Sequence, residues 1–365
     1  FFSRAVMEIL PFIEFYPDVL HCHDWQAALA AIYLKTIYCK RVEYQFIRAV
    51  FTIHNIEYQG QYSPDILGDV FGIPDNYRYL LEYGDCINLM KAAIECCEMF
   101  STVSPTYAQE IKNAEYAHGL QDEIRRNEFK LRGILNGIDV NSYNPATDSA
   151  LFAPFDGNDL GGKAVCKAEL QKMLGLPVRA DVPVIAMISR LVSHKGLDLV
   201  RASIEELLQS DVQFVLLGTG EREYEEFFRD VANRYRGKAV AVIAFNGDLS
   251  RKIYSGADMF LMPSKSEPCG LSQMIASRYF TVPIVRETGG LYDSIKPYGA
   301  GGNGFTFAAY NAHDMLYVIR EAISLYKDKE EWEKLMLKAG TTDFSWQRSA
   351  EEYKKMYSDT LALMK

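Results

Sequence analysis

The sequence predicts an α/β protein made of two domains, each with a parallel sheet. Short, almost continuously apolar runs alternate with longer amphipathic stretches, which is the pattern of buried parallel strands covered by helices on both faces. The chain has 365 residues, more than one ordinary domain contains. The alternation is interrupted once, by a stretch rich in proline and glycine, and this interruption predicts the domain boundary.

The first half of the chain contains four apolar runs that predict strands, separated by helical patterns. The strands are expected at 19–22, 49–53, 99–103 and 133–135, and helices at 25–40 and 87–97. Four strands are few for a doubly wound sheet, and the chain opens without an initiator Met. We therefore expect that the first part of this domain precedes the sequence given.

The interruption spans residues 139–181 and contains one helical pattern, at 163–174. The second half then restarts as a complete doubly wound unit. Strands are expected at 184–188, 213–217, 240–245, 259–262, 283–285 and 304–307, and helices at 197–208, 224–235, 271–280 and 328–338. The predicted division is 1–178 for the N-terminal domain, 179–345 for the C-terminal domain and 346–365 for a final helix. Trp346, Ala350, Tyr353 and Tyr357 share one face of that helix, which predicts packing on a neighbouring surface.

Composition excludes several classes of protein. The 39 Lys and Arg against 48 Asp and Glu give a net charge of −9, which argues against nucleic-acid binding. Seven cysteines without a C-x-x-C pair argue against a disulfide framework or a zinc site and favour a reduced, cytoplasmic protein. No apolar run is long enough for a transmembrane helix, so no membrane partner is expected.

Ligands of doubly wound sheets bind at the carboxyl ends of the strands, so the loops that follow the predicted strands are the candidate site. Arg190 and Lys195 follow the strand at 184–188 and could clamp a diphosphate above a helix N-terminus; the alternative is a pair of solvated surface cations. Thr288, Gly289 and Gly290 offer close backbone approach and free N–H groups to phosphate oxygens; the alternative is a plain tight turn.

Glu267 lies just before a predicted helix. Its carboxylate could orient a sugar hydroxyl or oppose positive charge in an oxocarbenium-like transition state, and the alternative is a role at the helix dipole. His21 and His23 resemble a metal-ligand pair, but no third ligand stands at a recognisable spacing, so no metal is expected. Gly218 and Gly220 begin a dinucleotide pattern without its third glycine, so NAD is not expected.

Eight segments resemble one family, the bacterial glycogen synthases and plant starch synthases of glycosyltransferase family 5. They are HCHDWQA at 21–27, FTIHNIEYQG at 51–60, STVSPTY at 101–107, LNGID at 135–139, SRLVSHKGLD at 189–198, PSKSEPCGL at 263–271, ETGGL at 287–291 and DFSW at 343–346. They cover nearly the whole chain in the family's order.

The resemblance implies the GT-B fold: two Rossmann-like domains facing across a cleft, with the final helix crossing back to the first domain. It implies retaining transfer of glucose from ADP-glucose to the 4-hydroxyl at the non-reducing end of an α-1,4-glucan, without a cofactor. By position, Arg190 and Lys195 match the diphosphate-binding pair, Glu267 the carboxylate beside the donor glucose, and His54 the histidine lining the reacting sugar. The matching substrate-binding residues are Asp24, Asn136, Phe245 as the base-stacking aromatic, Cys269, Gly270, Leu271, Thr288, Gly289 and Gly290.

The chain departs from the family's pattern in two places. The Lys-x-Gly-Gly-Leu loop that closes on the donor is not in the sequence, and Ile275 stands where the wider retaining pattern has a second glutamate. The first departure leaves a second hypothesis open, that this chain is a catalytically incompetent fragment or a nucleotide- or glucan-binding module. On that hypothesis it would bind ADP yet transfer little glucose. A third hypothesis, glucan phosphorylase chemistry, would require a lysine that holds pyridoxal phosphate.

Overall fold

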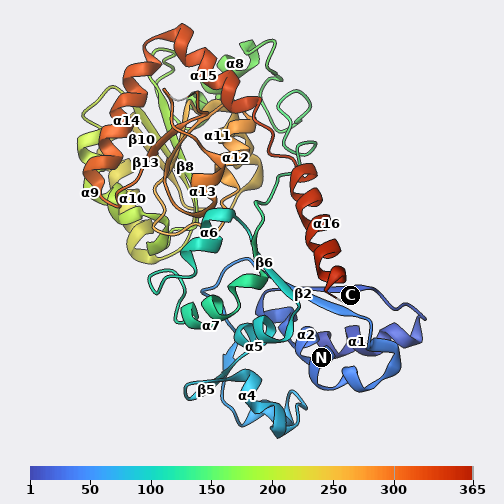
Figure 1. Cartoon of the computed structure of the whole chain (residues 1–365). Helices are drawn as coiled ribbons and strands as arrows, with labels where there is room; N and C mark the ends of the chain where they lie inside the picture. The colour runs from blue at the N-terminus through green and yellow to red at the C-terminus, as the bar shows by residue number, and fades with distance from the viewer. Residues whose placement is uncertain (300, 364–365) are drawn as a thin grey trace. The chain divides into compact units, whose positions relative to one another are not determined.

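The computed structural model describes residues 1–299 and 301–363, which form two compact units. Unit 1 comprises Phe1–Asn136 and Gln347–Lys365, and unit 2 comprises Gly137–Trp346. The chain therefore passes from unit 1 to unit 2 after Asn136 and returns after Trp346 (Figure 1).

Unit 1 is built on a four-stranded parallel sheet in the order β1-β2-β6-β7. Its strands are β1 (Val19–His23), β2 (Arg48–Ile53), β6 (Met99–Thr102) and β7 (Leu131–Gly133). The aromatic residues Phe51 and Phe100 are fully buried where β2 and β6 pair, and they anchor the core of this unit. The strand expected at 133–135 begins and ends earlier, because Leu131 to Gly133 are the residues that pair with β6.

Helices α2 and α5 pack together against this sheet, and unit 1 also has a small antiparallel sheet that the sequence did not predict. The helices are α1 (Phe2–Phe12), α2 (Asp24–Thr36), α3 (Ile66–Asp69), α4 (Arg78–Leu81), α5 (Leu89–Cys96), α6 (Pro105–Glu110) and α7 (Gln121–Arg126), with 3-10 turns η1 (Tyr38–Lys40), η2 (Val42–Tyr44), η3 (Asp75–Tyr77) and η4 (Glu128–Lys130). The small sheet has the order β3-β5-β4, with β3 (Gln61–Tyr62), β4 (Glu82–Tyr83) and β5 (Cys86–Asn88). Strands of two or three residues are too short to produce a readable alternation of apolar and polar residues.

Unit 2 is a doubly wound six-stranded parallel sheet in the order β10-β9-β8-β11-β12-β13. Its strands are β8 (Val184–Ile188), β9 (Gln213–Leu217), β10 (Ala239–Val242), β11 (Met259–Met262), β12 (Val282–Arg286) and β13 (Phe305–Phe307). Numbered within the unit, this is the 3-2-1-4-5-6 order of a dinucleotide-binding fold, in which the strand order reverses between the first and fourth strands. That reversal falls between β8 and β11, so the loops after these two strands flank the ligand crevice that such folds provide.

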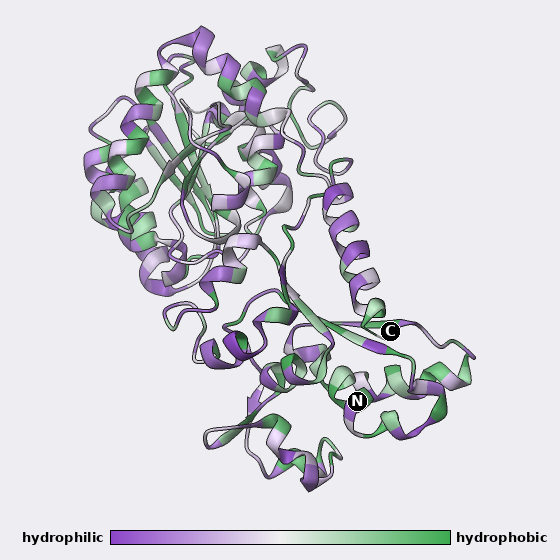
Figure 2. Cartoon of the chain, viewed as in Figure 1, coloured by the Kyte–Doolittle hydropathy of each residue, from purple (hydrophilic) through white to green (hydrophobic). Residues whose placement is uncertain are grey.

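Helices cover both faces of this sheet, α9 and α14 on one face and α8, α11 and α12 on the other (Figure 1). The helices and the turn of unit 2 are α8 (Gly161–Met173), η5 (Ser193–Lys195), α9 (Leu197–Leu207), α10 (Arg222–Arg234), α11 (Gly247–Gly256), α12 (Ser272–Arg278), α13 (Gly289–Ser294), α14 (Ala312–Tyr326) and α15 (Lys329–Gly340). The strands are mostly apolar and the helices are two-sided, as the sequence pattern predicts (Figure 2).

The domain boundary expected at residue 178 lies earlier in the structure, after Asn136. Residues 137–178 belong with unit 2 because α8 is bonded to its core. The ammonium of Lys163 on α8 donates hydrogen bonds to the carbonyl oxygens of Ser255, Ala257 and Tyr279 and to the Thr281 hydroxyl, at 2.8–3.1 Å. The composition shift marks a linker correctly, but it does not tell to which neighbour the linker's helix is attached.

The final helix, α16 (Trp346–Ala362), packs on the sheet of unit 1. Met356 joins Val50, Met99 and Ile134 in a small apolar cluster, with Tyr353 and Tyr357 against it. Of the four residues expected on the packing face, Tyr353 and Tyr357 lie there, whereas Trp346 is 46% exposed and Ala350 is exposed. The face is rotated toward Ser349, Met356 and Thr360, which are the buried residues of this helix.

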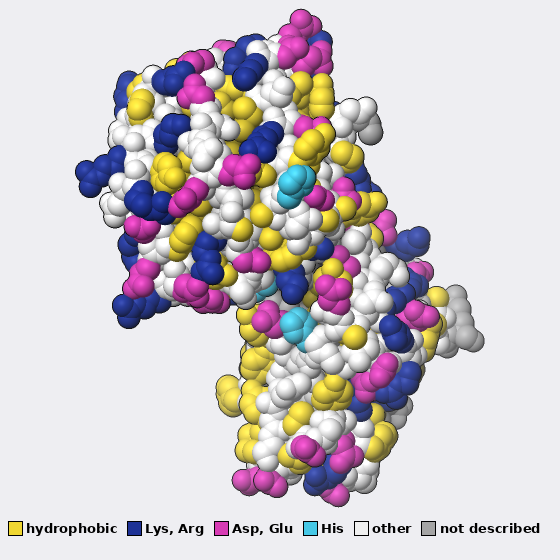
Figure 3. Space-filling model, turned by 90° about the vertical axis from the view of Figure 1, so that its left-hand side faces the viewer, with side chains coloured by type: hydrophobic (Ala, Val, Ile, Leu, Met, Phe, Trp, Pro, Cys, Tyr) yellow, Lys and Arg dark blue, Asp and Glu magenta, His cyan; other side chains and the backbone are white. Residues whose placement is uncertain are grey.

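The surface in Figure 3 carries basic and acidic side chains interspersed, without a large field of one sign on the face in view. Among the described residues, no helix combines the length and the apolar character that crossing a bilayer requires.

Candidate active site

The loops after β8 and β11 meet at the reversal of strand order in unit 2. The backbone N–H of Lys265 donates to the carbonyl oxygen of His194 at 2.9 Å and joins the two loops directly. Gly196 makes this approach possible. It has φ +73°, and a Cβ at that position would lie 2.0 Å from the carbonyl oxygen of Pro263. Only glycine fits there, because another side chain would push the two loops apart.

Lys195 and Glu267, predicted from separate loops, form an ion pair at this point. The Lys195 Nζ lies 2.7 Å from the Glu267 Oε2, and the two side chains are only 16% and 8% exposed. The Ser264 hydroxyl donates to the same carboxylate oxygen at 2.9 Å. A buried carboxylate needs such partners, and they fix its orientation before any ligand arrives.

Arg190 stands on the same loop but is exposed, and its guanidinium makes no hydrogen bond or ion pair within residues 1–299 and 301–363. The loop therefore presents one cation that is held by a carboxylate and one that is unengaged. An unengaged guanidinium beside a fixed ammonium is suited to bidentate binding of phosphate oxygens.

The glycines after β12 bring a third loop against Glu267. A Cβ on Gly289 would lie 2.0 Å from the Glu267 carbonyl oxygen, and the Gly290 N–H donates to that oxygen at 3.1 Å. The Thr288 N–H donates to the Arg286 carbonyl oxygen at 3.0 Å. The expectation of free N–H groups here is therefore wrong for Thr288 and Gly290, because the close packing of the loops turns these donors toward neighbouring carbonyls.

The loop before α12 keeps its backbone donors available. The N–H groups of Gly270 and Leu271 donate to no backbone carbonyl in the part of the chain that the structure describes. Gly270 has φ +69°, and the Cys269 side chain is buried at 6% exposure. Two adjacent N–H groups at this turn can donate to anionic or hydroxyl oxygens.

Phe245 lies beyond the end of β10, which stops at Val242 rather than at the predicted residue 245. Its side chain is 98% exposed. Asn246, the next residue, caps α11 by accepting the Leu249 N–H at 2.9 Å. This cap holds the backbone next to Phe245 in place. A fully exposed aromatic ring at the sheet's carboxyl edge is available for stacking.

In unit 1 the structure brings Asp24 and His54 together. The Asp24 Oδ1 accepts the backbone N–H of His54 at 2.8 Å, and Asp24 has φ +54°, a left-handed conformation that is strained for a residue with a side chain. The His54 Nε2 lies 3.0 Å from the His23 Nδ1. Asn136, the last residue of unit 1 before the chain crosses, has a buried Oδ1 with no hydrogen-bond partner among the described residues.

His21 connects this histidine pair to the final helix. Its Nδ1 lies 2.8 Å from the Tyr357 hydroxyl oxygen and its Nε2 lies 2.7 Å from the Thr52 Oγ1. Its ring contacts that of His23 at a tilt of 30°, with centroids 4.2 Å apart. Burial, and then the neighbouring His23 and His54, lowers the pKa of His21 from its ordinary 6.5 to about 3. The imidazole is therefore neutral at physiological pH and can both donate and accept a hydrogen bond. Sequence reasoning considered His21 only as a metal ligand.

No set of three His, Cys, Asp or Glu side chains in the described chain has a geometry that could hold a metal ion.

Acidification is expected to weaken the fold through His21. Between pH 6.5 and 3 the unfolded chain binds a proton at this residue and the folded chain does not, so this stability is present above pH 6.5 and is lost as the pH falls. At about 1.4 kcal/mol per pH unit, the loss between pH 7 and pH 5 amounts to about 2 kcal/mol. Unfolding by urea at the two pH values should show a loss that is about 2 kcal/mol larger in the unsubstituted protein than in His21→Gln.

The control for this experiment is His313→Gln, because the His313 side chain is 91% exposed and its replacement leaves His21 and its hydrogen-bond partners unchanged. An equal loss of stability in His21→Gln and in the unsubstituted protein would contradict the assignment.

A cavity of about 460 Å³ in unit 1 contains functional candidates that the sequence reasoning missed. It is lined by Trp25, Glu57, Tyr58, Gln59, Gly60, Gln61, Tyr62 and His118. Tyr58 and Tyr62 are 48% and 37% exposed, and aromatic faces next to amide and carboxylate groups form a surface suited to sugar rings. Trp25 and the segment 57–60 lie inside two of the matched motifs, so the sequence contained a signal for this cavity that was not interpreted as a binding site.

Models of two protein families match the chain. Residues 1–126 match the starch synthase catalytic domain, and residues 175–336 match the glycosyl transferases group 1.

Curated relatives match almost the whole chain. A glycogen synthase of Desulforamulus reducens is 45% identical over 99% of this chain and 76% of its own length. A glycogen synthase of Clostridium novyi is 46% identical over 99% of this chain and 77% of its own length.

Two solved structures are similar to the chain. The catalytic domain of starch synthase IV from Arabidopsis thaliana, bound to ADP and acarbose, superposes with a TM-score of 0.93 at 38% identity, over 99% of this chain and 76% of that one. A sucrose-phosphate synthase from Thermosynechococcus elongatus, at 17% identity and a TM-score of 0.64 over 99% of this chain and 78% of that one, shares the fold. The fold and the loops define a glycosyltransferase of the GT-B class. The chain belongs to the glycogen synthase and starch synthase family.

Proposed function

We propose that this protein transfers glucose from ADP-glucose to the 4-hydroxyl at the non-reducing end of an α-1,4-glucan, with retention of configuration. The observation that carries the proposal is the arrangement in unit 2 of the Lys195–Glu267 pair and the unengaged Arg190 at the reversal of strand order. Its family membership, and the ADP and acarbose bound to the related starch synthase, support the choice of nucleotide and of glucan.

The proposed donor site uses the cations of unit 2 to stabilise the leaving group. As the bond from the glucose C1 to the phosphate oxygen breaks, negative charge develops on ADP, and Arg190 and Lys195 oppose it. The Gly270 and Leu271 N–H groups are proposed to donate to donor oxygens beside them. The loops around this site pack closely through Thr288, Gly289, Gly290 and Cys269. Glu267 is proposed to lie beside the glucose, where its carboxylate opposes the developing positive charge.

The proposed transfer balances without a separate base residue. The acceptor's 4-hydroxyl oxygen forms a new bond to C1 on the face from which ADP departs, and its proton passes to the leaving phosphate oxygen. His54, oriented by Asp24 and His23, is proposed to line the reacting sugar, and Asn136 to contact it through the amide whose Oδ1 has no partner in the described chain. No metal or organic cofactor enters the proposal, because the charge that develops on ADP is opposed by side chains.

Phe245 is proposed to stack on the adenine, and its removal tests the nucleotide site without touching the diphosphate cations. Base–aromatic stacking contributes about 1–3 kcal/mol, so Phe245→Ala should weaken ADP binding by about tenfold or more. Calorimetric titration with ADP measures the change. Phe129→Ala, which removes a ring that is 73% exposed in unit 1, is the matched control. Equal ADP affinity in the two variants would remove the stacking role.

The glucan is proposed to bind at the aromatic cavity of unit 1, and Gly60 tests this. A Cβ on Gly60 would lie 2.8 Å from the Trp25 ring, and the residue has φ +68°. Gly60→Ala should therefore displace Trp25 and weaken glycogen binding by about tenfold, equivalent to about 1.4 kcal/mol, while ADP affinity stays unchanged. Retardation in a gel containing glycogen measures the first effect.

Gly68→Ala is the control for Gly60→Ala, because a Cβ on Gly68 would meet no atom within 4 Å. Glycogen binding that is equal in the two variants would exclude the cavity as the glucan site.

We also propose a reducing, cytoplasmic location, since all seven cysteines are free thiols in the structure.

A further inference from the structure

A second cavity, of about 290 Å³, lies in unit 2 at the edge of the sheet opposite to the candidate donor site. Asp258, which lines it, precedes β11 and accepts the N–H of Val184, the first residue of β8, at 2.8 Å. The cavity therefore lies below the amino-terminal ends of these strands, whereas Arg190, Lys195 and Glu267 follow their carboxyl ends. Residues of α8 and α15 line it, together with Asp258 and Tyr326.

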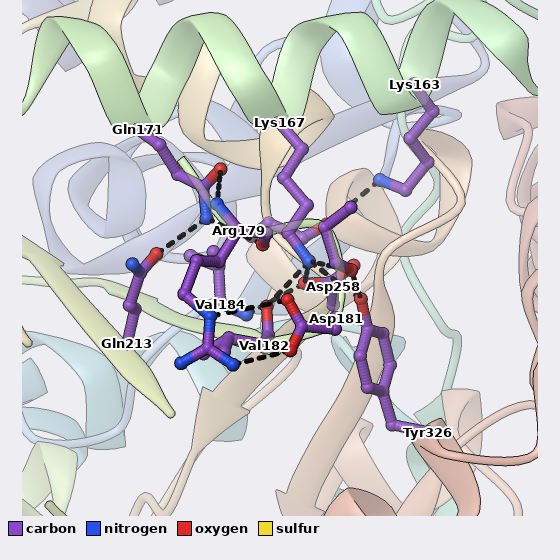
Figure 4. A network of polar contacts seen from close by, with 12 residues as sticks. Lys163, Lys167, Gln171, Arg179, Asp181, Val182, Val184, Gln213, Asp258 and Tyr326 are labelled. Carbon is purple, nitrogen blue, oxygen red and sulfur yellow. Dashed lines mark hydrogen bonds and ion pairs between the residues drawn. The ribbon is translucent and has the colours of Figure 1, made fainter. Parts of the chain in front are cut away.

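The floor of the cavity is a rigid polar network (Figure 4). The Lys167 Nζ lies 2.8 Å from the Asp258 Oδ2 and 2.7 Å from both the Val182 carbonyl oxygen and the Tyr326 hydroxyl oxygen. Lys163, on the same face of α8, donates to four oxygens of the core. The donors of both ammonium groups are engaged, so these lysines shape the floor and are not available to a ligand.

The walls are the facing sides of two helices, and one of them carries small residues. Ala164 and Ala168 of α8 lie four residues apart and so on one helical face, which leaves space in front of the helix. On α15, Trp332 and Met336 also lie four residues apart and present larger apolar surface. An apolar body of the size of one or two rings fits between such walls.

Two polar groups at this cavity have no hydrogen-bond or ion-pair partner among the residues that the structure describes. Trp332 is 3% exposed, and its Nε1 has no hydrogen-bond partner among the described residues. Lys329 is exposed at the rim, with its Nζ 3.4 Å from the centroid of the Tyr326 ring, and it forms no ion pair with any carboxylate in residues 1–299 and 301–363. A buried donor without an acceptor is unfavourable, and an ammonium above an aromatic ring remains free to bind an anion.

We propose that this cavity is a binding site for a small amphipathic monoanion, a single carboxylate or sulfonate on an aromatic or branched apolar body. The anionic group pairs with Lys329, and the body lies between the alanine face of α8 and Trp332. The charge of the lining favours a monoanion over a phosphate dianion. Lys163 is bound by oxygens of the core and Lys167 is paired with Asp258, which leaves Lys329 as the one cation of the cavity lining that can pair with a ligand.

The test is a fluorescence titration of the whole protein with 8-anilinonaphthalene-1-sulfonate, in the presence of saturating ADP. Ala164→Phe fills the cavity and should weaken probe binding at least tenfold. Its control is Val165→Phe, which adds the same ring to the next residue of α8, 46% exposed and outside the cavity lining. Binding of equal strength in these two variants, or no probe binding to the unsubstituted protein while ADP is saturating, overturns the proposal.

A second pair of variants tests the anion contact at exposed positions, where folding is not at risk. Lys329→Glu should weaken probe binding by about tenfold, whereas Lys327→Glu, the same charge reversal at an exposed residue outside the lining, should leave it unchanged. Glu333→Gln should strengthen binding by removing the competing carboxylate. Weaker binding in Glu333→Gln would overturn the monoanion class and indicate a zwitterionic ligand instead.

Discussion

Replacing Arg190 by alanine is expected to lower glucosyl transfer to glycogen by about 10²–10³-fold, the usual cost of removing one charged donor from a developing anion. The guanidinium is exposed and makes no hydrogen bond or ion pair within the described residues, so the folded structure should survive the change. The loss should appear in both transfer and ADP affinity, because the cation meets the diphosphate before and during the reaction.

Lys195→Ala should reduce transfer to a similar extent, but for two reasons. It removes a cation from the diphosphate and also leaves the Glu267 carboxylate, 8% exposed, without its ion partner. Arg201→Ala is the control for both variants, since Arg201 pairs with Glu223 on the surface of unit 2. Transfer and ADP affinity that match this control in Arg190→Ala would remove the diphosphate clamp from the account.

Glu267→Gln is expected to lower the maximal rate of transfer by about 10²-fold, with a much smaller effect on ADP-glucose affinity. The amide keeps the size of the carboxylate and can still accept from Ser264, so the loop should keep its shape. What it loses is the negative charge, and that charge acts mainly as positive charge develops on the sugar. Steady-state kinetics separate the two effects as a change in kcat against a change in KM.

Ser264→Ala is the matched control for Glu267→Gln, because it removes the neutral hydrogen bond to the same oxygen and keeps the charge. A kcat equal to that of Ser264→Ala, with only the KM raised, would assign Glu267 to the structural role at the start of the helix.

The sequence was sufficient to predict the six strands of unit 2, but not its helices α11 and α14. Its strands are buried on both faces, so runs such as Val184–Ile188, Gln213–Leu217 and Met259–Met262 are almost entirely apolar, and their bounds match the prediction. The pairing of Lys195 with Glu267, 72 positions apart, was not readable from spacing. The contact depends on the order of the strands in the folded sheet, and the spacing of residues along the sequence does not reveal that order.

The sequence was insufficient where the structure depends on packing between distant segments. The Gly290 N–H donates to the Glu267 carbonyl oxygen because two loops approach each other closely. A glycine in the sequence permits such an approach but does not predict that it occurs. The contact between His21 and Tyr357 joins residues 336 positions apart. The helical period predicts that Tyr357 lies on the packing face of α16. Only the fold of unit 1 determines that His21 is the residue it contacts.

The central claim, that unit 2 holds the diphosphate of ADP through Arg190, Lys195 and Phe245, is tested most directly by calorimetric titration of the protein and of Arg190→Ala with ADP. The account predicts one ADP bound per chain and a large loss of affinity in the variant. An absence of binding to the unsubstituted protein, or equal affinity in the two proteins, would contradict it.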